Sequence, residues 1–168
     1  LLKESMSAFA YRNDLDEIHS SQEPRVSIYG CFYNVEGITN GAYYYNHAEH
    51  RLQEIQQGDH RLRLQTGLSI DNVNLQQVPI CLHVAGNKDF LREELGYRGY
   101  RILQMEAGML VQSLLLTASA LGLGGHPLLG FDASKADDLY RMKGKTSLIQ
   151  IPIGSYRPRQ WLKGSLHS

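Results

Sequence analysis

The run from Leu121 to Phe131, Leu-Gly-Leu-Gly-Gly-His-Pro-Leu-Leu-Gly-Phe, is a segment that could hold a flat ligand. Glycine has no Cβ, so a planar ring can approach the backbone amides closely. Such amides can donate to the electron-rich edge of a flavin ring and tune its chemistry. His126 would then lie near the ring, where an imidazole titrates in the physiological pH range. An ordinary glycine-rich helix end also explains this run, so both interpretations stay open.

Two arginines, Arg157 and Arg159, form a second candidate ligand site. Each guanidinium group is a planar fork of donors, and two forks one residue apart could hold a phosphate bidentately. A solvated pair of basic residues in a C-terminal segment is an equally good explanation.

The histidines and cysteines show no metal-ligand spacing, so we expect no metal site. Cys31 and Cys81 lie in separate apolar runs and are expected to be small buried hydrophobic residues. His83 lies in the apolar run Val-Pro-Ile-Cys-Leu-His-Val-Ala and is expected to be a buried core histidine. Two cysteines without a disulfide framework favour a reducing compartment, so we expect a cytoplasmic protein.

Seventeen basic residues balance seventeen acidic ones. A net charge near zero argues against nucleic acid or an anionic membrane surface as the main partner. The most apolar stretch, 105–129, is interrupted by Glu106 and several glycines, which predicts a buried core helix with its exit loop and no membrane span. A length of 168 residues suits one domain, spanning 1–168.

The elements that position these residues follow from hydropathy periods. Runs rich in β-branched and aromatic residues predict strands at 26–35, 42–46, 51–55, 78–85 and 148–153. The fully apolar run 78–85 is expected at the centre of the sheet. We expect short helices at 3–18, 59–69, 88–95 and 133–142, the last capped by Asp132.

A change of period marks the longest element. From Tyr100 to Leu121, apolar residues recur at steps of three and four, which predicts a long helix with one wide apolar face. Glycines 122–125 are expected to end it as a cap and loop. The order of elements indicates an α+β sandwich, with a mixed or antiparallel sheet flanked by helices.

The N-terminal segment, Leu1 to Ala10, lacks the basic region and apolar core of a signal peptide. It has no initiator methionine and has the pattern of the middle of a helix. We therefore expect a cropped or processed chain.

Several motifs, in a shared order, carry a resemblance to a known family. The run Glu106-Ala-Gly-Met-Leu-Val-Gln-Ser, the glycines up to Gly125, Gly130-Phe131 and Ile151-Pro-Ile-Gly154 closely resemble the C-terminal half of the nitroreductase superfamily. Other motifs resemble its azoline-dehydrogenase (SagB-type) branch: Asn34-Val-Glu-Gly, Tyr43-Tyr-Tyr45, His50-Arg-Leu52 and Arg98-Gly-Tyr-Arg101. The resemblance covers about residues 20 to 155.

This resemblance implies a nitroreductase-like FMN-binding sandwich whose long central helix packs at the core of a homodimer, with flavins at the interface. It also implies the oxidation of thiazoline or oxazoline rings in peptides to thiazoles or oxazoles. The expected partners are therefore FMN, a second copy of the chain, and a peptide substrate or biosynthetic partner proteins.

Carried over residue by residue, the resemblance implies a set of FMN contacts. The loop Ser20–Arg25 resembles a family loop that lies along the flavin, although an ordinary hydrophilic loop before a strand would look similar. The implied contacts are Ser21, Gln22, Arg25, Gln112, Gly124, Gly125, His126 and Gly130, with Arg157 and Arg159 for the phosphate.

Three departures bear on catalysis. Active azoline dehydrogenases carry a Lys-Tyr pair where Glu94 and Leu95 stand here. Azoline oxidation needs a base; Glu94 could serve and leucine cannot, while Tyr97 could substitute from two residues away. Met109 and Ser113 replace the usual His and Asn of the family helix. The family's N-terminal helices, with their arginine phosphate clamp, are expected to be lacking or cropped in this chain.

Two alternatives therefore stay beside azoline oxidation. One is an NAD(P)H-dependent nitro or quinone reductase, which the Val-Glu-Gly and Arg-Gly-Tyr-Arg motifs favour less. The other is a non-catalytic family member that serves as a scaffold or partner subunit in a peptide-tailoring complex.

Overall fold

An antiparallel sheet of six strands organises the computed structural model of the chain, which describes residues 1–9, 25–70, 73–90 and 92–155. The spatial order is β3-β2-β1-β4-β6-β5, and each neighbouring pair is antiparallel. The strands are β1 (Val26–Phe32), β2 (Gly41–Asn46), β3 (Arg51–Gln57), β4 (Ile80–Gly86), β5 (Leu123–Gly125) and β6 (Thr146–Ser155). The predicted α+β class is confirmed, as is the central position of the apolar strand β4.

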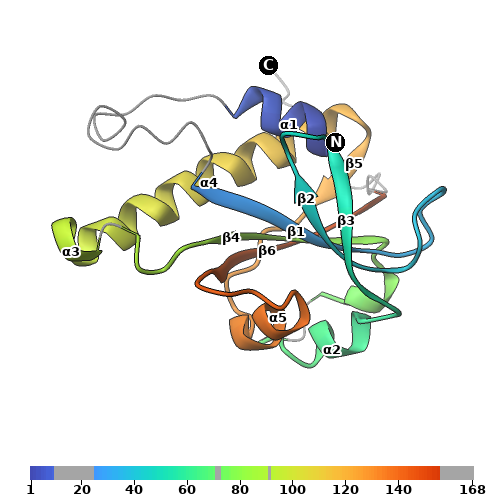
Figure 1. Cartoon of the computed structure of the whole chain (residues 1–168). Coiled ribbons are helices and arrows are strands. Elements are labelled where there is room, and N and C mark those ends of the chain that lie inside the picture. Colours follow the sequence, from blue (N-terminus) through green and yellow to red (C-terminus); the bar gives the residue numbers. More distant parts are fainter. Residues whose placement is uncertain (10–24, 71–72, 91, 156–168) are drawn as a thin grey trace, which may run out of the picture.

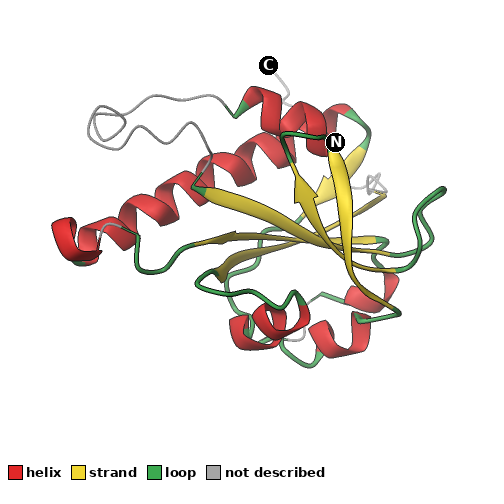
Figure 2. Cartoon of the chain, in the orientation of Figure 1, coloured by secondary structure: helices red, strands yellow, loops and turns green. Residues whose placement is uncertain are grey.

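Helices cover both faces of this sheet (Figure 1 and Figure 2). One face carries α1 (Leu2–Ala8) and the long α4 (Tyr97–Ala120), which α3 (Arg92–Leu95) precedes. The other face carries α2 (Arg61–Gln65), the 3₁₀ turn η1 (Leu75–Gln77) and α5 (Ala133–Leu139). The central strands β1 and β4 are buried on both sides, and their residues contribute to two apolar clusters, one on each face of the sheet.

The helix α4 supplies most of the helical side of the first cluster. Its buried positions include Leu103, Ala107, Leu110 and Leu114, spaced three or four residues apart so that they share one face. They pack against inward residues of β1, β4 and β6. The helix begins at Tyr97, three residues before the predicted start, because Gly96 takes the positive φ (55°) of the preceding turn.

The helix α4 is long and apolar enough to cross a membrane, judged by its length and its mean hydropathy of 1.2 alone. Its buried face packs on the sheet and on α1, where the Ser113 hydroxyl donates to the Ser5 carbonyl over 2.8 Å. This is the packing of a core helix.

The glycine run after α4 corrects one prediction. Gly122 ends the helix with a φ of 72°, as expected of a glycine cap. However, residues 123–125 are an edge strand, β5, and not a loop. The ladder to β6 continues beyond it, because the amide of His126 donates to Pro152 and that of Leu128 to Gln150.

Helix boundaries elsewhere differ from expectation at their ends. The side chain of Asp132 accepts from the amide of Lys135 and caps α5, as predicted, but α5 ends at Leu139 rather than at 142. The predicted helix 3–18 is shorter at its described end, since α1 stops at Ala8; residues 10–18 lie outside the described residues.

Candidate functional site

A hollow of about 370 Å³ lies at the C-terminal end of α4, between this helix and β5. Leu115 and Ser119 line it from the helix, and residues 122–125 line it from the glycine run. Two of the predicted flavin contacts, Gly124 and Gly125, are therefore neighbours in one concave site. Its walls are small or apolar, as a flat ring requires.

The backbone of β5 can offer a donor here. Alternate residues of an antiparallel strand direct their N–H groups to opposite edges. Because the amides of His126 and Leu128 donate to β6, the amide of Gly125 points away from the sheet, and β5 is an edge strand in the described chain. Gly125 thus presents an N–H group of the kind that a flavin edge accepts.

The absence of a side chain at Gly125 also serves packing. A Cβ there would lie 2.7 Å from Cδ2 of Leu115, which is too close without a shift of that side chain. Gly125→Val would place a side chain at the expected ring position, but it would also strain the contact between α4 and β5. Loss of flavin in this variant would therefore not by itself show where the ring lies.

The other predicted contacts on this side of the chain lie apart from that hollow. Gln112 and His126 are exposed, Gln112 on the outer face of α4. Gly130 lies toward the α2 layer, where its carbonyl accepts from the amide of Ser69. Their roles as flavin contacts remain predictions, as do those of Ser21, Gln22, Arg157 and Arg159, which lie outside the described residues.

Arg25 forms an ion pair that the sequence analysis missed. Its Nη1 lies 2.5 Å from Oε1 of Glu106 on α4, and both side chains are almost fully buried. The guanidinium also lies 5.1 Å from the centre of the Phe90 ring. The other carboxylate oxygen of Glu106 has no partner in the described structure. Whether Arg25 also contacts a flavin stays a prediction.

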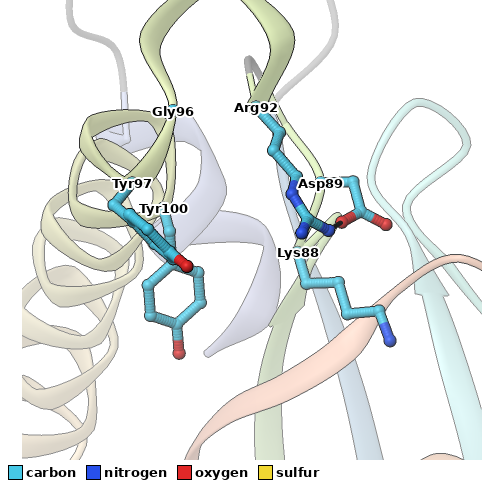
Figure 3. A pocket seen from close by; sticks show the side chains of 6 residues that line it. All are labelled: Lys88, Asp89, Arg92, Gly96, Tyr97 and Tyr100. Atoms are coloured by element: carbon cyan, nitrogen blue, oxygen red, sulfur yellow. Dashed lines mark hydrogen bonds and ion pairs between the residues drawn. The ribbon is translucent and has the colours of Figure 1, made fainter.

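A second hollow, of about 680 Å³, lies at the opposite end of α4 (Figure 3). Its lining consists of Lys88, Asp89, Arg92, Gly96, Tyr97 and Tyr100. The predicted catalytic residue Tyr97 is thus at a concave site, and its side chain is 88% exposed. The other predicted catalytic residue, Glu94, lies exposed on α3 and is not part of this lining.

The two hollows are far apart within one chain. From Tyr100 to Ser119 the helix rises about 28 Å. The register of the sheet gives a similar separation. One row of paired residues crosses the sheet through Gly125, Ile153, Ile80 and Phe32. Arg25 lies seven residues before Phe32, which is about 23 Å from that row along the strand. A single copy therefore does not bring Tyr97 or Arg25 to the glycine hollow.

A buried polar cluster lies on the sheet face opposite α4. Nδ1 of His83 is 2.8 Å from the hydroxyl of Tyr140, which is 3.4 Å from Sγ of Cys31. Burial lowers the pKa of His83 to about 3, so the ring is neutral, and burial raises the pKa of the Cys31 thiol. The predictions of a core histidine and buried cysteines are confirmed.

Comparison with known proteins agrees with the fold. The model of the nitroreductase family matches residues 20–155. The chain belongs to the nitroreductase family. Among curated proteins, it is 28% identical over 131 residues to a protein assigned to the nitroreductases from Methanocaldococcus jannaschii. That match covers 77% of this chain and 64% of the relative, so the chain spans less than two thirds of its relative's length.

Solved structures share the fold. One is a protein assigned to the nitroreductases from Anabaena variabilis, with a TM-score of 0.71 and 23% identity, covering 79% of this chain and 27% of the other. Another is the E. coli microcin synthetase McbBCD complex with truncated pro-MccB17 bound, with a TM-score of 0.69 and 18% identity, covering 94% and 63%.

Proposed function

We propose that this chain is an FMN-dependent oxidoreductase that acts as a homodimer and dehydrogenates thiazoline or oxazoline rings in peptides. The observation that carries the flavin site is the hollow at the end of α4, with Gly124 and Gly125 in its wall. The peptide substrate is supported by the SagB-type motifs and by the fold shared with a synthetase complex that holds a truncated pro-peptide.

The residues of the glycine hollow fit a flavin ring. The outward amide of Gly125 supplies a donor, and Leu115 supplies an apolar wall. FMN, when bound, supplies a two-electron acceptor for the hydride that an azoline loses on becoming aromatic. The chain itself must accept the ring proton, and Tyr97 and Glu94 are our candidates for that step.

The exposed face of α4 supports the dimer. Met105, Met109 and Leu116 are 70%, 46% and 62% exposed, and with Gln112 they follow a spacing of four, three and four residues. Apart from Gln112 this stripe is apolar, and an exposed apolar stripe on a helix is a typical interaction surface. Among the described residues, nothing outside the helix's own backbone lies within 4 Å of the space a Cβ would take at Gly108, in the middle of this face, so a second helix could approach closely there.

Antiparallel pairing of two α4 helices would also complete the site. The centre of α4 lies near Gly108, so a two-fold axis there places the Tyr97 end of one copy beside the glycine end of the other. The two hollows, about 28 Å apart in one chain, would then adjoin across the interface. In this arrangement Tyr97 can serve a flavin held by the partner subunit.

The test begins with the visible spectrum of the purified protein before and after incubation with FMN and gel filtration. We expect a retained flavin band and the conversion of azoline peptides to azoles. Tyr97→Phe and Glu94→Ala should then lower kcat without releasing flavin. The control Arg141→Ala, on the far side of the sheet, should leave kcat unchanged. A protein that stays colourless after FMN addition would exclude the enzymatic function.

An NAD(P)H-dependent nitro or quinone reductase is the second candidate, because the curated relative is assigned to the nitroreductases. Flavin-dependent NADPH oxidation with a nitro or quinone acceptor, without azoline turnover, would favour it. A non-catalytic partner subunit is the third candidate, motivated by the exposed Glu94 beside Leu95. A stable dimer without flavin that binds peptide would favour that role.

A further inference from the structure

The hollow at the start of α4 carries more positive charge than its own carboxylate balances. Lys88 and Arg92 bring two positive charges, and Asp89 brings one negative charge. Asp89 is paired with Arg92, with 3.0 Å between Oδ1 and Nη1. In the described ranges of the chain, no carboxylate forms an ion pair with the ammonium of Lys88. One positive charge is therefore uncompensated.

The opposite wall of this hollow offers two phenol groups (Figure 3). Tyr97 and Tyr100 project side by side from the first turn of α4, across from the charged residues. The amide of Gln104 donates to the hydroxyl oxygen of Tyr100 over 2.7 Å. The Tyr100 oxygen thus acts as the acceptor in that bond, and its own hydrogen remains to be donated to another group.

We propose that this hollow recognises a substrate carboxylate that lies next to a planar ring. The ammonium of Lys88 is its counter-ion, the Tyr100 hydroxyl donates to it, and the aromatic faces of Tyr97 and Tyr100 contact the ring. The inference rests on the proposed function, since it names the substrate class of that site: azoline peptides with a carboxylate close to the ring.

The size of the charge selects a carboxylate over a phosphate. A carboxylate carries one negative charge and matches the single uncompensated cation. A phosphate monoester carries about 1.5 to 2 negative charges near neutral pH and would leave charge unbalanced here. The side chain of Lys88 is exposed, so solvent screens the attraction. We therefore expect the carboxylate to improve affinity by only about three- to fivefold.

The experiment uses 2-methylthiazoline-4-carboxylate and its carboxamide, two probes with the same ring and different charge. Their dissociation constants are measured by ligand-observed NMR with the full chain, with and without FMN. The variants are Lys88→Met, which keeps the apolar stem, and Lys143→Met, an exposed lysine beyond α5. We expect the wild-type protein and Lys143→Met to prefer the acid by about three- to fivefold and Lys88→Met to lose that preference.

Three outcomes would overturn the inference. The first is equal affinity of the wild-type protein for both probes, and the second is an unchanged preference in Lys88→Met. The third is weaker retention of FMN, but not of riboflavin, in Lys88→Met, because the hollow would then hold the cofactor phosphate. Because binding is measured without turnover, the carboxylate preference can stand even where azoline oxidation fails. Conversely, turnover of azoline peptides without a preference for the acid probe would support the proposed function and contradict the carboxylate site.

Discussion

Arg25 and Glu106 join the start of β1 to the middle of α4 through a buried ion pair of 2.5 Å between residues 81 positions apart. The loop expected to lie along the flavin ends at Arg25, and α4 is the proposed dimer helix. The pair therefore anchors Arg25, where that expected loop ends, to α4.

Removal of one partner of this pair should be strongly destabilising. Arg25→Met leaves the Glu106 carboxylate buried without its counter-ion, and we expect a loss of about 3–5 kcal/mol in the free energy of unfolding by urea. The double variant with Glu106→Leu should recover a large part of that loss, because no charge is then buried. Arg92→Met removes an exposed pair and should cost about 1 kcal/mol or less. An Arg25→Met protein as stable as the Arg92→Met control would show that the buried pair is not formed.

Local patterns in the sequence predicted much of this fold. The period of Leu103, Ala107 and Leu110 indicated the long helix, and Asp132 indicated the cap of α5. The edge strand β5 was missed because its Leu-Gly-Gly residues have little intrinsic β preference. Pairing with β6, about thirty residues away in sequence, makes it a strand.

The candidate site was less predictable, because it too depends on contacts between residues far apart in the sequence. Glycines 124 and 125 were predicted as ligand contacts from their residue type, and they line a hollow in the structure. Lys88 and Tyr100 carry no local signal, and only the approach of the β4 exit to the start of α4 brings them together. The partner of Arg25 depends on a tertiary contact, which no spacing rule reveals. Most such contacts require the sheet order to be known first.

His83 should make the protein sensitive to acid. Its pKa is about 3 in the folded state because of burial, against about 6.5 when unfolded. Below pH 6.5 the unfolded chain binds a proton that the folded chain does not, so stability is present above that pH and falls by about 1.4 kcal/mol per unit as the pH drops toward 3.

The check is urea unfolding between pH 7.5 and 4.5, compared with His83→Gln. Glutamine cannot titrate, so the variant should lose less stability than the wild-type protein over this range, even though it starts less stable. Parallel pH profiles for the two proteins would assign the acid sensitivity to other groups.

Gly125 should distinguish packing from flavin binding. Gly125→Ala places a methyl group about where Cδ2 of Leu115 lies, and we expect a loss of about 1–3 kcal/mol in stability by urea unfolding. The double variant with Leu115→Ala makes room for that methyl group. If the methyl group also blocks the ring, FMN retention after gel filtration should fall in both the single and the double variant. Full FMN retention in Gly125→Ala would place the ring elsewhere.

Charge on the outer face of α4 should separate the dimer without unfolding the chain. Met105→Glu and Met109→Glu change side chains that are exposed in one copy, so the stability of the monomer should move by about 0.5 kcal/mol or less. Across a two-fold axis near Gly108, Met109→Glu brings two like charges together, and Met105→Glu places a charge in the apolar interface. Light scattering should therefore report a monomer for both variants. Leu62→Glu, on α2 at the opposite face of the sheet, is the matched control and should stay dimeric. If the site is shared between two copies, both methionine variants also lose FMN; retention of FMN by a monomeric variant would show that one chain holds the cofactor alone.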